Sequence, residues 1–389
     1  MTLVEPRWDA ARSALSEAVH PLPPTRLPLE ACDGLVLAED LVAKVALPSF
    51  DTSAMDGWAV AGDGPWALVG SALAGRPFAG DLAPGQAVVI ATGGVVPDAA
   101  DAVVPSEDGT VEAGELRAPA PQPGMHVRPA GEECRAGEVL AEAGTAASPA
   151  LIGLAAAAGL DDVLVVPRPR VALVLFGDEL ALSGEPGPGL VRDSLGPQVP
   201  AWVRRMGAEV VLVERGEDTL EAHVDAIRRA ATAADMVLTT GGTAAGPVDH
   251  LHDAIAACDG SVLVDTVAVR PGHPMLAATV ADHRAWLVGL PGNPQSAIVT
   301  LLSLAAPVLA GLAGRVPLPA LDEVRTAEAL PSPPHEDRLV LGSVSGGVFT
   351  AGSHLGSGML RGLAGATGFA VLPPGGVPAG TRVRWLPLP

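Results

Sequence analysis

The chain has 389 residues and a formal net charge of −20, with 48% hydrophobic and 17% charged residues. This length predicts two to four domains, and the composition excludes a disordered chain. A surface this acidic repels phosphate backbones, so we expect no nucleic-acid partner, although a local anion pocket is compatible with it.

The first 167 residues predict two small domains. Residues 1–47 contain helical and extended pieces interrupted by prolines, and residues 48–130 alternate short apolar runs with Gly and Pro turns, which predicts a β-rich module. Residues 131–167 include an Ala-rich helix from Pro149 to Ala158 that ends at Gly159, a suitable helix-terminating glycine. We assign 1–47 and 131–167 to one discontinuous N-terminal domain.

From Arg170 onward, strand-like and helix-like segments alternate, which predicts a parallel sheet covered on both faces in an α/β domain spanning 168–315. The predicted strands are Val171–Phe176, Glu209–Val213, Met236–Thr240 and Trp286–Leu290, and the predicted helices are Pro197–Met206, Asp218–Ala233, Asp249–Ala257 and one that begins at Pro294. Residues 316–389 carry short strand signals and form a predicted C-terminal β domain. The fold class is therefore α/β plus β, in several domains.

The apolar stretch from Ala297 to Gly314 is barely long enough to span a bilayer. It contains polar residues and Pro307, so we interpret it as a buried core helix whose terminus lies near this proline, and we expect no membrane partner. The three cysteines are far apart and odd in number, and no secretory signal is visible. These features argue against a disulfide scaffold and structural zinc and predict a cytoplasmic protein.

Three motifs directly follow predicted strands, at residues 177–179, 241–246 and 289–294. In a parallel α/β sheet, ligands bind beyond the carboxyl ends of the strands, so we expect the motifs to converge at one edge. The glycines of the second motif, Gly241 and Gly242 among them, allow backbone N–H groups to face an anion, but a tight turn explains them equally well.

Two further segments offer anion-binding groups. Asn293 suits a helix N-cap and Pro294 the first helical position, so Pro291, Gly292, Asn293 and Ser296 either bind substrate at a helix terminus or simply cap a core helix. Arg270 and His273 flank a rigid Pro-Gly turn. Arg270 suits an oxyanion, with a structural salt bridge as the alternative.

Asp178, Glu179, Asp249 and Asp218 place carboxylates near the same predicted edge, which indicates a Mg²⁺–nucleotide site. Asp249 also suits a helix N-cap. His250 and His252 diverge at their spacing on a helix, so we do not expect a zinc pair.

In the β module, residues 50–60 and Thr92-Gly93-Gly94 are dense in small and polar residues, and hairpin turns explain them as well as chemistry does. Taken together, however, the motifs resemble the molybdopterin molybdenumtransferases, the family that includes the C-terminal domain of gephyrin. The resemblance rests on segments that occur in the family's order over nearly the whole chain: Pro48–Val60, Thr92–Val104, Gly177–Leu180, the Gly241-Gly242 loop with Asp249, Pro271–Pro274 and Gly289–Pro294.

The resemblance implies a four-domain homodimer with its active site between the α/β domain of one subunit and the β module of the other. It implies an enzyme that transfers molybdenum from molybdate into adenylylated molybdopterin, releasing AMP and forming molybdenum cofactor with Mg²⁺. Position by position, it implies catalytic roles for Asp56, Thr92, Glu179 and Asp249, metal binding by Asp178, Glu179 and Asp249, and substrate contacts from Glu133, Ser357 and the substrate-binding residues named above.

The chain also departs from the family pattern. Phe176 stands where Thr or Ser is usual, Leu195 where Asn is usual, and Arg270, His273 and His252 where lysines are usual. Because neutral histidines are weaker oxyanion ligands than lysines, a non-catalytic pterin- or nucleotide-binding paralogue, acting as carrier or scaffold, is the alternative function. A nucleotide hydrolase with no molybdate requirement is a third.

Overall fold

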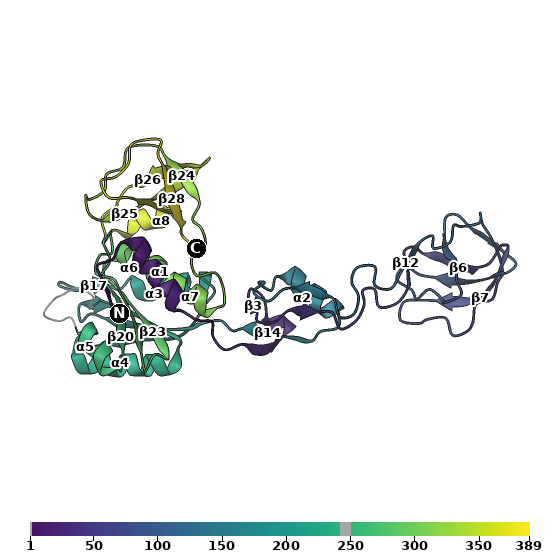
Figure 1. The fold of residues 1–389 in the computed structure, drawn as a ribbon, viewed down its shortest axis with the longest axis horizontal. Helices are drawn as coiled ribbons and strands as arrows, with labels where there is room; N and C mark the ends of the chain where they lie inside the picture. Colours follow the sequence, from purple (N-terminus) through teal and green to yellow (C-terminus); the bar gives the residue numbers. More distant parts are fainter. Residues whose placement is uncertain (1, 242–249) are drawn as a thin grey trace. The chain divides into compact units, whose positions relative to one another are not determined.

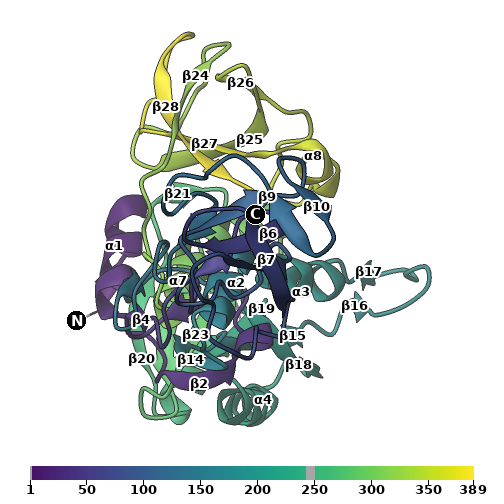
Figure 2. The ribbon, with the colours of Figure 1, turned by 90° about the vertical axis from the view of Figure 1, so that its right-hand side faces the viewer.

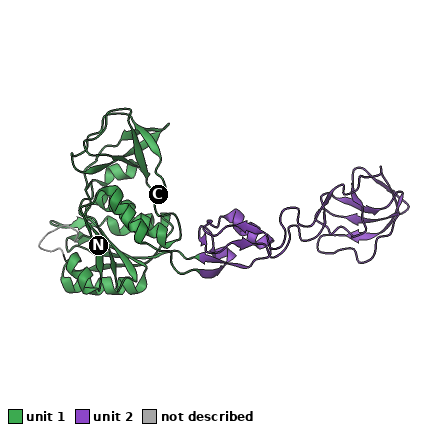
Figure 3. Cartoon of the chain, viewed as in Figure 1, with its two compact units in different colours: residues 1–24, 166–389 green, residues 25–165 purple. Residues whose placement is uncertain are grey.

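The computed structural model describes residues 2–241 and 250–389, which divide into two compact units (Figure 3). Unit 1 comprises residues 1–24 and 166–389, and unit 2 comprises residues 25–165. The sequence pattern assigns all of residues 1–47 to one domain with residues 131–167. In the structure, residues 1–24 belong instead to unit 1, together with the α/β domain. Helix α1 (Trp8–Ala18) buries Trp8, Ala11 and Leu15 in the core of unit 1, because this i, i+3, i+7 stripe is apolar.

Unit 1 is built on a seven-stranded sheet. The strands, in spatial order, are β1 (Leu3–Val4), β20 (Ser261–Asp265), β22 (Leu276–Val280), β23 (Ala285–Leu290), β19 (Met236–Thr240), β15 (Arg170–Phe176) and β18 (Glu209–Gly216). The predicted α/β class is confirmed, but the sheet is mixed rather than all parallel, because β22 runs antiparallel to both of its neighbours. The hairpin from β22 to β23 turns on three consecutive left-handed residues, Ala281 to His283.

Helices cover both faces of this sheet (Figure 1). Along β15, Val171, Leu173 and Leu175 join one apolar core while Ala172 and Val174 join the other, so alternate side chains of one strand serve two layers. One face carries α1, α3 (Leu195–Arg205), α6 (Pro294–Thr300) and α7 (Ala306–Leu312), and the other carries α4 (Leu220–Ala233) and α5 (Leu251–Ala257). Helix α4 is capped by Thr219, one residue later than predicted.

The apolar stretch is a core helix, as predicted, but it does not end near Pro307. Residues Pro294–Leu312 form one helix that is long and apolar enough to cross a membrane, and 89% of it is buried inside the molecule. A π-helical segment, Leu301–Ala305, joins α6 to α7 just before Pro307. The wider π turn accommodates the proline without ending the helix. Ser303 of this segment accepts a 2.8 Å hydrogen bond from Trp8 Nε1.

The C-terminal β domain is a small barrel within unit 1. Its strands are β24 (Glu323–Thr326), β25 (Asp337–Ser345), β26 (Val348–Ala351), β27 (Gly368–Leu372) and β28 (Arg382–Pro387). The barrel closes because β25 pairs with both β26 and β27. Strand β21 (Val269–Arg270) leaves the α/β domain to pair with β25, and helix α8 (Leu360–Gly365) contacts β25.

Unit 2 contains the predicted β-rich module. Its six-stranded sheet has the order β10 (Thr110–Glu112), β11 (Glu115–Arg117), β7 (Trp66–Ala72), β8 (Gln86–Ile90), β6 (Gly57–Ala61) and β9 (Ala102–Pro105). The rest of the unit consists of short strand pairings, one 3-10 helix and one α-helix: β2 (Thr25–Pro28), η1 (Leu29–Ala31), β3 (Val36–Leu37), β4 (Leu41–Val42), β5 (Thr52–Ser53), β12 (Val127–Arg128), β13 (Val139–Ala141), α2 (Pro149–Ala157) and β14 (Asp162–Val166). Helix α2 is followed by Gly159 at φ +85°, as the sequence predicted, and it begins with a Ser148 cap.

Candidate active site

The predicted motifs meet at the carboxyl edge of the seven-stranded sheet. Strands β15, β19 and β23 are parallel and end at Phe176, Thr240 and Leu290, so the residues that follow them share one edge. This confirms the convergence expected from the strand pattern. Gly242 and Asp249, predicted from the same motifs, lie outside the described residues.

A cavity of about 510 Å³ opens at this edge. Four predicted site residues line it, namely Glu179, Gly241, Gly292 and Asn293. The rest of its lining was not predicted as site: Phe176, Leu180, Val191, Arg192, Asp193, Ser194, Leu195, Thr240, Pro294, Gly358 and Leu360. The cavity thus combines the α/β motifs with a loop of the C-terminal barrel.

A short arm forms one wall of this cavity. The arm is a two-stranded parallel pair, β16 (Leu180–Ala181) and β17 (Val191–Arg192), with a projecting loop between the strands (Figure 2). It leads into Asp193, which is 7% exposed and whose Oδ1 accepts hydrogen bonds from the backbone N–H groups of Leu195 (2.9 Å) and Gly196 (3.0 Å). Asp193 therefore fixes the start of α3 beside the cavity.

The start of α6 forms another wall. Asn293 occupies the N-cap position and Pro294 the first turn, as predicted, but the Asn293 side chain makes no capping hydrogen bond. Gln295, buried to 1% exposure, donates from Nε2 to the carbonyls of His354 (2.8 Å) and Met359 (2.7 Å). These bonds pin the barrel loop that contains Ser357 against the helix start, where the Ser357 carbonyl accepts from Gln295 N at 2.8 Å.

Arg270 and His273 lie elsewhere along the unit and do not line the cavity. Arg270 Nε donates to Glu336 Oε2 at 2.9 Å, and His273 Nε2 lies 3.1 Å from Glu5 Oε1. For Arg270 the structure therefore shows the salt-bridge alternative. Ser296 is 4% exposed inside α6 and also does not line the cavity.

His250 and His252 do not share a ligand position. His252 Nε2 lies 3.1 Å from Asp265 Oδ1, whereas the His250 ring packs edge-on against His223, with centroids 5.6 Å apart. The expectation that these histidines form no zinc pair is consistent with this geometry.

The predicted metal ligands Asp178 and Glu179 follow β15 directly. The Asp178 backbone N–H donates to Asp218 Oδ2 at 3.1 Å, so a third carboxylate lies beside them. Carboxylate oxygens at an open edge fit Mg²⁺, which takes one or two protein carboxylates and completes its shell with water and phosphate oxygens.

In unit 2 the predicted residues Asp56 and Thr92 are hydrogen-bonded. Thr92 N donates to Asp56 Oδ1 at 2.7 Å. Hydrogen bonds from the backbone and side chain of Thr92 lower the pKa of Asp56 below its ordinary value, because they stabilise the ionised carboxylate. Glu133 lines a separate cavity of about 670 Å³ together with Thr52, Arg128 and Glu132.

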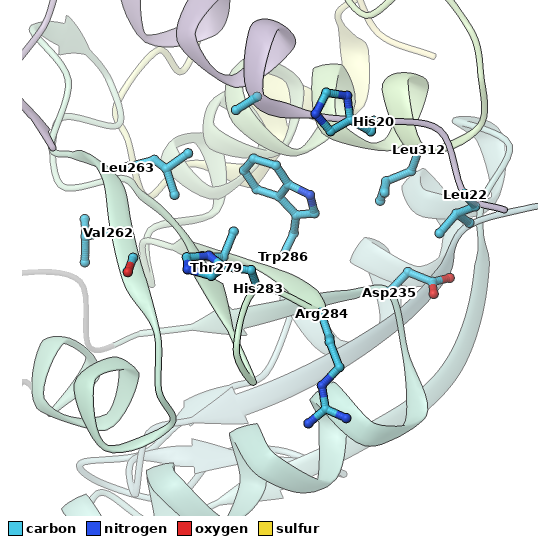
Figure 4. A pocket seen from close by; sticks show the side chains of 12 residues that line it. His20, Leu22, Asp235, Val262, Leu263, Thr279, His283, Arg284, Trp286 and Leu312 are labelled. Atoms are coloured by element: carbon cyan, nitrogen blue, oxygen red, sulfur yellow. The ribbon is translucent and has the colours of Figure 1, made fainter. Parts of the chain in front are cut away.

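A further cavity of about 550 Å³ opens at the amino edge of the sheet, where Asp235 precedes β19 and Trp286 lies near the start of β23. Figure 4 shows the Trp286 indole between His20 and Leu312 on one side and Thr279 and His283 on the other. No predicted motif lines this cavity. We therefore place the candidate active site at the carboxyl edge, where the motifs lie.

Models of known protein families match nearly the whole chain. Three family models match: the MoeA N-terminal region (domain I and II) at residues 7–159, a probable molybdopterin binding domain at 172–311, and the MoeA C-terminal region (domain IV) at 323–388.

The chain is also similar to named proteins. It is 35% identical over 351 residues to molybdopterin molybdenumtransferase 2 of Mycobacterium tuberculosis, covering 85% of this chain and 82% of that protein. It is 32% identical over 320 residues to the molybdopterin molybdenumtransferase of Haemophilus influenzae, covering 79% and 78%. A crystal structure of the molybdopterin biosynthesis MoeA protein from Pyrococcus horikoshii matches with a TM-score of 0.84 and 25% identity over 99% of each chain.

Proposed function

Because the chain belongs to the molybdopterin molybdenumtransferase family, we propose that it transfers molybdenum from molybdate into adenylylated molybdopterin, forming molybdenum cofactor and releasing AMP. The family relation itself supports a transferase role in molybdenum cofactor biosynthesis. The observation that carries the finer proposal is the cavity at the carboxyl edge, since four predicted site residues line it together.

The residues of this edge divide the work as follows. Gly292 leaves room for close approach of a ligand to the backbone, because an added Cβ there would meet open space. Gly241 adopts φ +81° close to the Phe176 carbonyl, a conformation that suits glycine. The positive end of the α6 dipole, beside Gly292 and Asn293 in the cavity lining, favours an anionic group such as the pterin phosphate. Glu179 and Asp178 hold Mg²⁺, with Asp249 as the predicted third ligand. The bound ion would polarise the phosphoanhydride so that AMP can leave.

We further propose that the protein is a cytoplasmic homodimer and that Asp56, Thr92 and Glu133 contribute to the reaction. These roles are supported by the family's motifs alone. Arg270 and His273 remain predicted oxyanion ligands, and in that role each exchanges its carboxylate partner for substrate.

The carrier or scaffold function is a second candidate, and a specific observation favours it. The two histidines that stand where the family has lysines, His252 and His273, each already face a carboxylate at 3.1 Å. A site in which histidines already paired with carboxylates replace the lysines would retain a pterin or nucleotide pocket but bind molybdate weakly.

Single-turnover conversion of adenylylated molybdopterin by the purified chain with Mg²⁺, with and without molybdate, tests these functions. Molybdate-dependent AMP release with active cofactor supports the transferase. Tight binding without AMP release contradicts it and supports the carrier, and AMP release that ignores molybdate indicates a hydrolase. Glu179→Gln should slow turnover about 100-fold or more if its carboxylate acts on the reacting groups. Glu185→Gln, the same change on the exposed arm loop, should not.

A further inference from the structure

Three metal-ligating side chains converge beyond the first strand of the sheet, outside the cavity described above. The imidazole nitrogen of His273 and carboxylate oxygens of Glu5 and Glu336 lie within 4.8 Å of one another. His273 Nε2 and Glu5 Oε1 are 3.1 Å apart. Within residues 2–241 and 250–389, no other three His, Cys, Asp or Glu side chains bring their ligand atoms this close together.

Each member is positioned by a different part of the chain. Glu5 follows β1, and its backbone N–H donates to the Asp265 carbonyl at 2.9 Å. The carbonyl of His273 accepts from Val267 N at 3.0 Å in the loop before β22. The carbonyl of Glu336 accepts from Ser332 Oγ at 3.2 Å. Because backbone contacts fix all three positions, the cluster does not depend on one mobile loop.

Asp337, the residue after Glu336, connects the two segments that supply the carboxylates. Asp337 is 4% exposed and forms two hydrogen bonds with Arg7, from Nε at 2.9 Å and from the guanidinium NH2 group at 2.6 Å. This pair ties the segment after β1 to the start of β25, the two segments that supply the carboxylates. The cluster is thus held from both sides.

The geometry is close to that of a coordination site. Zn²⁺ with bonds of about 2.1 Å in tetrahedral arrangement separates its ligand atoms by about 3.4 Å. The His273–Glu5 separation of 3.1 Å is close to this spacing, and the Glu336 oxygen lies within 4.8 Å of both ligand atoms. The side chains are 57% (Glu5), 30% (His273) and 17% (Glu336) exposed, so the site opens to solvent on the Glu5 side.

We propose that Glu5, His273 and Glu336 bind a divalent transition-metal ion of the Zn²⁺ class. One imidazole with two carboxylates suits this class better than Mg²⁺, which prefers oxygen ligands alone. Three protein ligands leave a position for water or for an oxyanion. The ion would also relieve the repulsion between the carboxylates of Glu5 and Glu336. Of these two, Glu336 is paired with the Arg270 guanidinium. The proposal does not depend on the transferase function.

Equilibrium dialysis of the chelator-treated full-length chain against Zn²⁺ at pH 7, without pterin, nucleotide or molybdate, tests the proposal. We expect one Zn²⁺ per chain that excess Mg²⁺ does not displace. His273→Ala and Glu336→Gln should each weaken binding at least tenfold, with circular dichroism confirming the fold. Glu5→Gln changes an exposed side chain and should weaken binding without affecting folding.

His252→Ala is the matched control, because His252 also lies 3.1 Å from a carboxylate but, among the residues that the structure describes, belongs to no cluster of three such ligands. It should leave the bound ion in place. The proposal is overturned if no stoichiometric Zn²⁺ binds, if the Glu5, His273 and Glu336 variants bind as the unmodified chain does, or if His252→Ala abolishes binding while His273→Ala preserves it.

Discussion

Asp193 offers a quantitative test of how the edge cavity is held. Its Oδ1 accepts the backbone N–H groups of Leu195 and Gly196 at 2.9 and 3.0 Å, and the α3 N-cap residue, Ser194, makes no side-chain cap. Asp193→Ala removes the acceptor for both donors. A lost helix cap costs about 1 kcal/mol and a hydrogen bond to a charged group about 1.5–3 kcal/mol. Because water at this edge reaches part of the turn, we expect about 2 kcal/mol in total.

Asp193→Asn keeps a carbonyl acceptor and loses the charge, so we expect it to cost about 1 kcal/mol, half as much. The assay is hydrogen exchange of the segment 194–205, which reports local opening of α3. At 1.36 kcal/mol per tenfold change, Asp193→Ala should speed exchange about 30-fold and Asp193→Asn about 5-fold.

Asp218→Ala is the control for this experiment. Asp218 accepts a single exposed hydrogen bond from Asp178 N at 3.1 Å, so its loss should leave exchange of α3 unchanged. Unchanged α3 exchange in Asp193→Ala, or equal exchange in the Ala and Asn variants, would refute the view that the charged carboxylate holds this wall of the cavity.

Three further predictions follow from single sites. In Gly196→Ala, the added Cβ would clash with Asp193 Oδ2, so urea titration should show a loss of about 1–3 kcal/mol in the free energy of unfolding, and a loss under about 0.5 kcal/mol would contradict the contact. For Asp56, NMR titration should give a pKa below 3.8 that rises, but stays below 3.8, in Thr92→Ala, which keeps the backbone donor. Since the folded-state pKa is lowered, the stabilisation is present above about pH 4 and is lost as the pH falls through the folded pKa. Burial raises the pKa of the Cys258 thiol, so this cysteine should resist a thiol reagent at pH 8 in the folded chain and react after unfolding; rapid labelling of folded protein would contradict its burial.

The strands of the α/β domain were predictable where both faces are buried. Val171–Phe176 and Met236–Thr240 are continuous apolar runs, and β15 and β19 have nearly those bounds. Strand β22 was missed although Leu276–Val280 is also apolar. Its hairpin turns on three non-glycine residues in the left-handed region, and such a turn carries no sequence signal of the Asn-Gly kind.

The candidate site likewise contains residues whose positions were predictable from the sequence and residues whose partners were not. The meeting of Glu179, Gly241 and Gly292 was predictable, because parallel strands carry the residues that follow them to one edge. The partners of Arg270 and His273 were not. Glu336 and Glu5 lie 66 and 268 positions away in the sequence, and local pattern holds no information on such ion pairs.

The charged groups of unit 1 are therefore distributed unevenly around the carboxyl edge. The cavity beyond β15, β19 and β23 is lined by glycines, apolar residues and the helix start, with Glu179, Arg192 and Asp193 as its charged side chains. The ion pairs Glu5–His273, Asp265–His252 and Glu336–Arg270 lie near β1, β20 and β21. These paired groups lie outside the cavity lining, in which Arg192 is the cationic side chain. Arg192 is therefore the side chain of the lining that can pair with an anion, whereas the cluster of Glu5, His273 and Glu336 has the ligand types that suit a cation.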